Sequence, residues 1–226
     1  MLSRRHYDAV TFDLVDTLAI FDPPEVIISK FIRRFGVQKD PQYIKKMFTR
    51  IDDSLLDNFS NPREYYISLN NAVLEMLNLP RKGLDLLHFW FDKSNYRLEK
   101  DLPQILEKLK KQGFRLGIIS NNLSWEVRLF LKDNNILEYF DAFVTPDVAN
   151  SFKPEKKIFE KALEMLGTSR LRTVHVGDSL LEDYLAAKEA GLHAILVVRK
   201  NEEMIKNLDV TYIRCLGELV GLKCEG

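Results

Sequence analysis

Short, wholly apolar runs recur along the chain and are separated by longer stretches with a helical period. Strands that helices cover on both faces have this continuous apolar pattern, which is typical of parallel sheets. The pattern predicts strands in YDAVTFDL at 7–14, FRLGIIS at 114–120, AFVT at 142–145, TVHVGD at 173–178, HAILVV at 193–198 and, more weakly, VTYI at 210–213.

From about residue 100 onward, apolar residues recur every three or four positions between these runs. Helices are expected at 102–113, 124–135, 154–167 and 180–191. Gly113, Gly167 and Gly191 stand where helices commonly end, and Ser124 is a candidate N-cap. The alternation of strand and helix predicts right-handed βαβ units and an α/β, Rossmann-like three-layer core with a mainly parallel sheet.

Residues 22–98 have a different pattern, with no convincing strand. Pro, Gly and Asn separate four helix-period stretches, namely PPEVIISKFIRRFG, DPQYIKKMFTRIDDSLLDN, NPREYYISLNNAVLEMLNLP and LDLLHFWFDKSNYRLEKD. We therefore expect an all-helical domain at 20–98, inserted after the first strand of a core formed by 1–19 and 99–226. The aromatic HFWF at 88–91 is expected in its core, and Lys45, Lys46 and Arg50 on a solvated face.

Composition narrows the possible partners. The chain has 226 residues, 46% of them apolar, and 33 basic side chains balance 33 acidic ones. Without a basic run, neither nucleic acid nor an anionic membrane is an expected partner. The absence of a signal peptide or of about 18 consecutive apolar residues predicts a soluble, cytoplasmic protein. A monomer or a homodimer is expected. Cys215 and Cys224 could form a disulfide, but reduced thiols are the expectation there.

Polar side chains follow the predicted strands at the points where the apolar runs stop. Ligands bind beyond the carboxyl ends of strands in an open parallel sheet, so these side chains are candidates for one site. Three clustered carboxylates repel one another and demand a cation, for which Mg²⁺ is the natural choice. The candidates are Asp13 after the first strand, Ser120 and Asn121 after the second, Lys153 beyond the third, and Asp178 with Asp183 after the fourth.

This set of residues suits phosphate chemistry. A carboxylate such as Asp13 can attack phosphorus only if the repulsion between two anions is neutralised, and Mg²⁺ with Lys153 would do so. Ser120 and Asn121 would donate hydrogen bonds to the transferring group, and Thr17 would do the same or orient Asp13. His175 lies inside an apolar strand and is expected to be a core histidine rather than a catalytic one.

Over essentially its whole length the sequence resembles the haloacid dehalogenase-like (HAD) superfamily of hydrolases. FDLVDTL, IISNN, FKPEKKIF and HVGDSLLEDYLAAKEAGL match its four motifs in order, and residues of about 20–98 match the helical cap that follows motif I. The resemblance implies a covalent aspartyl intermediate on Asp13. It also implies Mg²⁺ held by Asp13, the backbone carbonyl of Val15 and Asp178, with Asp183 in support.

One position departs from the pattern of the family's phosphatases. Their motif I is DxDxT, in which the second Asp protonates the leaving group and later activates water, whereas this chain has Val15 there. Asp16 is not an expected substitute, because successive side chains point in different directions. Since a positioned general acid or base contributes about 10²- to 10⁴-fold in rate, Val15 should raise the barrier by roughly 3–5 kcal/mol.

Several activities remain open. The favoured one is Mg²⁺-dependent hydrolysis of a small phosphorylated metabolite whose leaving group is good, or to which the cap or the substrate supplies the proton. A metal-independent 2-haloacid dehalogenase also lacks the second Asp, but Asp178 departs from its pattern, and its cap arginine has only candidates in Arg33, Arg34 and Arg50. A member that binds a phosphorylated ligand or a protein with little or no turnover is a third possibility. Phosphonoacetaldehyde hydrolysis is a fourth, without an identifiable cap lysine. Hinges are expected near 18–22 and 97–101.

Overall fold

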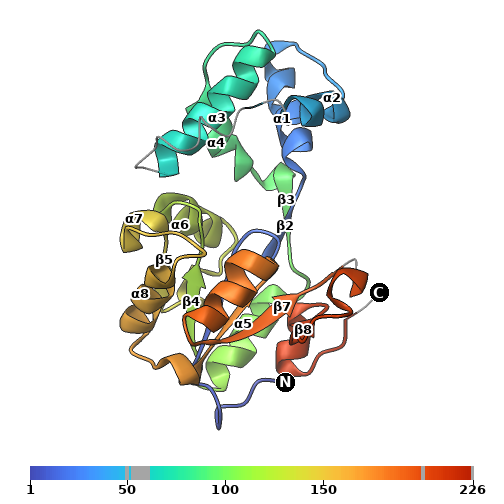
Figure 1. The fold of residues 1–226 in the computed structure, drawn as a ribbon. Coiled ribbons are helices and arrows are strands. Elements are labelled where there is room, and N and C mark those ends of the chain that lie inside the picture. The colour runs from blue at the N-terminus through green and yellow to red at the C-terminus, as the bar shows by residue number, and fades with distance from the viewer. Residues whose placement is uncertain (49–50, 52–61, 200–201, 225–226) are drawn as a thin grey trace. The chain divides into compact units, whose positions relative to one another are not determined.

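A computed structural model describes residues 1–48, 51, 62–199 and 202–224 and divides the chain into two compact units (Figure 1). The first unit comprises Met1–Ile20 with Leu98–Gly226, and the second comprises Phe21–Arg97. Each unit has its own apolar core, so each is described separately. Arg50 and, apart from residue 51, the part 49–58 of the helical stretch expected at 40–58 lie outside the described residues.

A six-stranded sheet forms the centre of the first unit, in the order β5-β4-β1-β6-β7-β8, and its neighbouring strands pair in parallel. Every apolar run singled out in the sequence contains one of these strands, and helices flank the sheet, so the predicted α/β class is confirmed. The strands are β1 (Ala9–Phe12), β4 (Arg115–Ile119), β5 (Ala142–Val144), β6 (Thr173–Gly177), β7 (His193–Val197) and β8 (Tyr212–Ile213).

The helices of this unit follow the predicted alternation, with three local differences. They are α5 (Leu102–Lys111), α6 (Ser124–Asp133), α7 (Pro146–Ala149), α8 (Lys156–Leu166) and α9 (Ala186–Glu189). The first difference is the short α7, a helix that was not predicted. Ser124 is the first residue of α6 and Leu123 the cap, so the predicted Ser N-cap is wrong; the Ser124 hydroxyl bonds Asp147 instead. The stretch expected as one helix from 180 begins as a π-helical turn, Leu180–Leu185, before α9.

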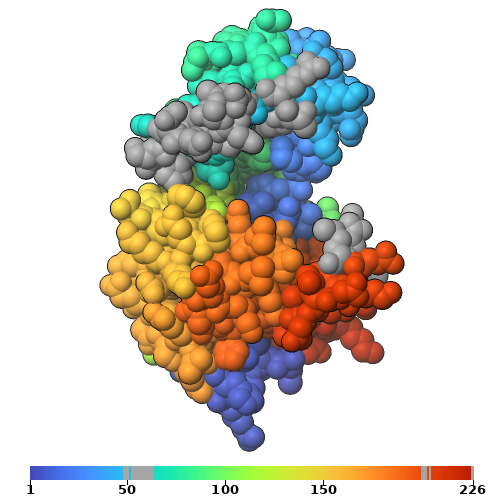
Figure 2. Space-filling view, in the orientation of Figure 1, coloured from blue at the N-terminus to red at the C-terminus, as the bar shows by residue number. Residues whose placement is uncertain are grey.

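Helix α8 packs on β4 and β5, and α9 packs on β7. On the face of the first unit seen in Figure 2, the segment of α7 and α8 (yellow to light orange) lies beside the segment of α9 (orange). Between these helices and the sheet, a core of buried aliphatic side chains includes Ile119, Val144, Ile158 and Leu196. Strand β1 is fully buried at the middle of the sheet, which explains its unbroken apolar sequence.

The second unit is mainly helical, with α1 (Pro24–Ile32), α2 (Pro41–Phe48), α3 (Pro62–Met76) and α4 (Gly83–Trp90). Its core includes Ile28, Phe31, Leu74 and Leu86. Phe89 and Phe91, of the HFWF segment, are buried as expected. Lys45, which pairs with Glu25 at 3.8 Å, and Lys46 are exposed, as predicted.

One short strand corrects the prediction that residues 22–98 contain none. Strand β3 (Tyr96–Leu98) pairs with β2 (Ala19–Phe21) where the chain passes between the two units. The stretch 84–101 is not one helix, because α4 ends at Trp90 and the Asp92 side chain accepts a hydrogen bond from Ser94 N at 2.9 Å, which caps a 3₁₀ turn (Lys93–Asn95). A three-residue strand is too short to leave a periodic signal in the sequence.

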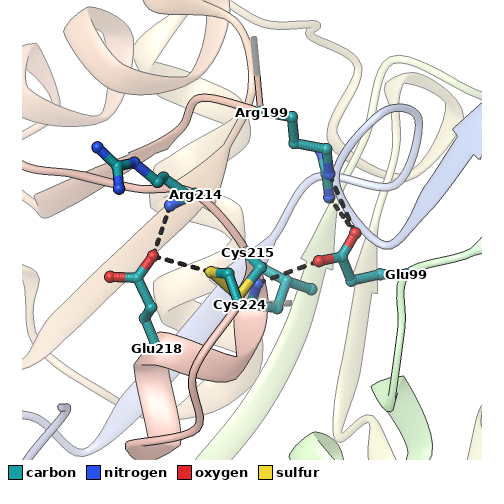
Figure 3. The surroundings of a disulfide bond; sticks show 7 residues. Glu99, Arg199, Arg214, Cys215, Glu218 and Cys224 are labelled. Carbon is teal, nitrogen blue, oxygen red and sulfur yellow. Dashed lines mark hydrogen bonds and ion pairs between the residues drawn. A yellow bond between two sulfur atoms is a disulfide. The ribbon is translucent and has the colours of Figure 1, made fainter. Parts of the chain in front are cut away.

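The cysteine expectation is also corrected, because Cys215 and Cys224 form a disulfide (Figure 3). Between them, the 3₁₀ turn Leu216–Val220 reverses the chain and brings their Cα atoms to 5.7 Å. The described part of the chain contains no helix long and apolar enough to cross a membrane.

Candidate active site

Three neighbouring strands of the sheet end at the same edge, and each is followed by a predicted site residue. Asp13 follows β1, where its N–H donates to Val176 O at 2.9 Å, and Ser120 follows β4, where its N–H donates to Val144 O at 3.1 Å. Asp178 follows β6 directly. The parallel arrangement thus brings three loops together, and ligand atoms of Asp13, Asp178 and Asp183 lie within 4.8 Å of one another.

Lys153 lies in the middle of this cluster, although it is far from every other member in sequence. Its Nζ donates to Asp13 Oδ1 and to Asp183 Oδ1, each at 2.6 Å, and only 3% of its surface is exposed. Burial alone would lower the pKa of Lys153, but the two carboxylates outweigh it and raise that pKa above its ordinary value. The lysine is therefore a permanent buried cation.

Asn121 positions Lys153 through the backbone. Its Oδ1 accepts from Lys153 N at 2.7 Å, while its Nδ2 donates to Lys153 O at 3.1 Å and to Glu182 Oε2 at 3.3 Å. The predicted contact of Asn121 with substrate remains a prediction. What the structure shows is an amide that ties the second strand end to the Lys153 loop.

Asp183 receives donors from three directions. Besides Lys153, Ser179 N–H donates to its Oδ2 at 3.0 Å, and His175 Nε2 lies 3.2 Å from its Oδ1. Burial raises the pKa of Asp183, but Lys153 and His175 overcome this effect and hold the pKa below its usual range. Asp183 is thus an ionised acceptor at neutral pH.

His175 is a buried histidine of β6, as expected for a core residue. Burial lowers its pKa, against the opposing effect of Asp183, so the ring is neutral. Since the Asp183 carboxylate can only accept, Nε2 carries the hydrogen, and Nδ1 accepts from the Thr11 hydroxyl at 2.9 Å. Thr11 and His175 together orient the carboxylate of Asp183.

The negative charges of Asp13 and Asp178 are not fully compensated by Lys153. Burial raises the pKa of Asp13 to about 7, with Asp183 and Asp178 adding to the effect and Lys153 opposing it. Burial also raises the pKa of Asp178 to about 6, with contributions from Asp183 and Asp16. Three carboxylates around one ammonium leave an excess of negative charge. The oxygen donors and this charge deficit fit a hard divalent cation such as Mg²⁺.

The other residues of the predicted site have different surroundings. Thr17 Oγ1 donates to Asp178 Oδ1 at 3.4 Å, so in this structure it contacts a carboxylate other than Asp13. Ser120 Oγ donates to Asn122 Oδ1 at 2.9 Å. Val15 is half-buried, and Asp16 has a left-handed backbone with φ of 54°. The predicted catalytic roles of Thr17 and Ser120, and the predicted Val15 carbonyl ligand, remain predictions.

A glycine makes room for the Asp183 carboxylate. A Cβ at Gly177, the last residue of β6, would lie 2.2 Å from Asp183 Cγ, which is far inside contact distance. We expect Gly177→Ala to displace this carboxylate and to lower the free energy of unfolding by about 1–3 kcal/mol. Urea unfolding measures this effect.

Gly117→Ala in β4 is the matched control, because its Cβ would meet the flexible tip of Leu166 at 3.0 Å. It should be affected less than Gly177→Ala. An equal loss in both variants would contradict the special role of the Asp183 contact.

The strand-end rule also covers Arg199, which the sequence interpretation missed. Arg199 is the second residue after β7, and its guanidinium donates to the backbone carbonyls of Asp16 and Thr17, the latter at 2.8 Å. Its position beyond an apolar run was the available signal. Thr11, Ser179 and Glu182, by contrast, had no signal of their own.

Comparison with known proteins agrees with this geometry. A family model described as haloacid dehalogenase-like hydrolase matches residues 85–197. The chain is 40% identical over 120 residues to a glyceraldehyde 3-phosphate phosphatase of Methanothermobacter thermautotrophicus, an alignment that spans 49% of this chain and about half (52%) of that protein. It is 30% identical to a pyrophosphatase, PpaX, of Bacillus cereus, over 81% of this chain and 80% of that protein.

Among solved structures, a HAD phosphatase from Thermococcus onnurineus matches with a TM-score of 0.66 and 27% identity, covering 94% of this chain and 95% of the other. The family model covers half of the chain, and the pyrophosphatase extends the similarity over most of it. The motifs in the sequence, the strand ends that carry them and these similarities agree. The chain belongs to the haloacid dehalogenase-like hydrolases.

Proposed function

We propose that this hydrolase removes a phosphate group from a small phosphorylated molecule, with Asp13 as the nucleophile and Mg²⁺ as the cofactor. The observation that supports this most strongly is the cluster of Asp13, Asp178 and Asp183, in which the buried Lys153 bridges Asp13 and Asp183. Two of the similar proteins are a glyceraldehyde 3-phosphate phosphatase and a pyrophosphatase, so both are named for phosphate substrates.

In the proposed reaction, a carboxylate oxygen of Asp13 attacks phosphorus, and the bond from phosphorus to the leaving-group oxygen breaks with its electron pair on that oxygen. Water then hydrolyses the aspartyl phosphate and restores the carboxylate. Lys153 orients Asp13 through Oδ1 and balances charge, and the Ser120 loop donates hydrogen bonds to the transferring group.

Asp13, Asp178 and the Val15 carbonyl would hold Mg²⁺, with Asp183 in support. When bound, the ion neutralises the repulsion between the carboxylate and the substrate phosphate. Asp183 is already held by Lys153, Ser179 and His175, so its contribution is to keep the cluster charged and in place.

Val15 limits the kind of substrate. With hydrocarbon where related phosphatases carry a general acid, the leaving oxygen must depart without a proton from that position. This favours substrates whose leaving group is a stable anion, such as a phosphate or a phenolate. Phosphate esters of simple sugars are disfavoured, because their leaving alkoxide requires a proton. The helical unit of residues 21–97 is proposed to act as a cap that opens and closes over the site.

Metal removal tests the proposal. Phosphate release from p-nitrophenyl phosphate should fall at least about 100-fold in EDTA and return when Mg²⁺ is added, because the uncompensated carboxylates repel the anionic substrate. Chloride release from 2-chloropropionate is measured in parallel. Chloride release without metal, and no phosphate release, would contradict the phosphatase in favour of a dehalogenase. If neither phosphate nor chloride were released, the protein would be a member of the family that binds a phosphorylated ligand or a protein without turnover.

A further inference from the structure

The loop that follows β1 is held from outside the carboxylate cluster. The guanidinium of Arg199 donates to the carbonyls of Asp16 and Thr17, the latter at 2.8 Å. These carbonyls belong to the two peptide groups that flank Thr17, so one side chain fixes both peptide planes. The same loop carries Asp13 and Val15, and it bends at Asp16 through a left-handed backbone.

Arg199 is itself held in place by a buried glutamate. Glu99, which is 5% exposed, accepts from Arg199 Nε at 3.0 Å and from Nη2 at 2.7 Å through its Oε2 (Figure 3). Its other oxygen accepts from Leu216 N–H at 3.3 Å, beside the disulfide. Such a two-pronged pair restricts the rotation of the guanidinium more than a single contact does.

Glu99 also reaches the loop directly, because its backbone N–H donates to Leu18 O at 2.9 Å. Carbonyls of three consecutive residues, from Asp16 to Leu18, therefore accept from the Glu99–Arg199 pair. In the other direction, Leu18 N–H and Ala19 N–H both donate to Leu14 O, at 3.0 and 3.2 Å, and close the turn. The pair and this turn together define the path of the backbone between Val15 and Ala19.

We propose that Arg199, oriented by Glu99, is a positioning residue for the loop that carries Asp13. The catalytic consequence rests on the proposed function. Displacing a reacting group by about 1 Å can lower a rate by roughly 100-fold, so a guanidinium that sets two peptide planes beside the nucleophile acts on turnover without contacting the substrate.

The chain offers a matched control at the amino ends of β1 and β6, the opposite end of these strands from the carboxylates. Arg172 pairs with Asp8 at 2.9 and 2.7 Å and donates to two successive backbone carbonyls, those of Arg4 and Arg5. These contacts precede β1 instead of following it. Arg172→Gln therefore deletes the same chemical pattern away from the carboxylates, and it should leave turnover unchanged.

The test compares Arg199→Gln, Glu99→Gln, the double variant and Arg172→Gln. Arg199→Gln should lower kcat by about 10- to 100-fold with KM changed less than about threefold. The substitution also leaves the buried Glu99 without its cation, so the Tm of the variant should fall. The double variant removes both charges and should recover most of the Tm while kcat stays low. Arg199→Lys, which keeps one donor group, should recover part of kcat.

Hydrogen exchange of the Leu18 and Ala19 amides gives a readout that needs neither metal nor substrate. These amides should exchange faster in Arg199→Gln and in the double variant than in the wild type or Arg172→Gln. Recovery of kcat with the Tm in the double variant, or unchanged exchange, would overturn the proposal. If the wild type itself released no phosphate, the proposed function would fail, and the exchange comparison alone would decide whether Arg199 positions the loop.

Discussion

Asp13→Asn should abolish turnover and, in metal-free protein at pH 8, stabilise the fold. The amide cannot attack phosphorus, so kcat should fall by at least about 10⁴-fold. The Lys153 ammonium keeps its 2.6 Å contact with Asp183, and the buried Lys153 is not left unpaired. The lost activity is therefore not a consequence of unfolding.

The stabilisation follows from the raised pKa of Asp13, which is about 7 instead of the ordinary 3.8 because burial disfavours the carboxylate. When folding raises the pKa of a carboxyl group, the free energy of unfolding falls as the pH rises from the pKa of the unfolded state to that of the folded state. The penalty is absent below about pH 4 and complete above about pH 7. Asn does not ionise, so the free energy of unfolding of Asp13→Asn should exceed that of the wild type by about 1–4 kcal/mol at pH 8 in EDTA.

Urea unfolding at pH 5 and pH 8, with and without Mg²⁺, measures this difference. The gain from Asp13→Asn should shrink at pH 5 and when Mg²⁺ is present, because the cation compensates the charge. Glu189→Gln, which changes an exposed carboxylate paired with Lys156, serves as the control and should alter stability little at either pH. A variant less stable than wild type at pH 8 would show that the Lys153 contact outweighs the burial of Asp13.

Val15→Asp should raise phosphatase activity most on substrates with poor leaving groups. Val15 is half-buried, so a carboxylate there keeps access to water and a proton. A positioned acid contributes about 10²- to 10⁴-fold, and this gain should appear with alkyl phosphates whose leaving alkoxide requires a proton. With p-nitrophenyl phosphate, whose leaving phenolate is stable, the gain should be small. The measurement is kcat/KM across phosphate esters of increasing leaving-group pKa.

Two variants separate the acid from other effects of the substitution. Val15→Asn has nearly the shape of the Asp variant but no acidic proton to transfer. It should leave kcat/KM as steeply dependent on the pKa of the leaving group as in the wild type. Asp16→Asn keeps a residue type that tolerates the left-handed backbone at this position. If Asp16→Asn steepened the dependence, or Val15→Asp failed to flatten it, Asp16 or another group would already supply the proton.

The sheet could be predicted because its strands are buried on both faces. Each strand from Ala9–Phe12 to Tyr212–Ile213 lies within an apolar run that stands out in the sequence. Strand Tyr96–Leu98 could not be predicted in this way, since it owes its conformation to pairing with Ala19–Phe21. The disulfide was missed for a related reason, because only the 3₁₀ turn at Leu216–Val220 brings Cys215 and Cys224 together.

The carboxylates of the site follow strand ends and were therefore predictable, whereas the contacts that orient them were not. Lys153 bridges Asp13 and Asp183 because the loop after β5 reaches across the edge of the sheet. The neutral His175 between Thr11 and Asp183 depends on the register of β1 against β6, which pairs Thr11 with His175. No local pattern specifies this register.

The central place of β1 in the sheet has a consequence for biosynthesis. This strand is synthesised before its two neighbours, β4 and β6, which lie far along the chain at 115–119 and 173–177. Both edges of β1 therefore stay without their partner strands while the helical unit and most of the core are synthesised. Strands whose partners arrive late fold slowly and are open to aggregation. The segment that leads to Asp13 should thus be the one most dependent on chaperones in the nascent chain.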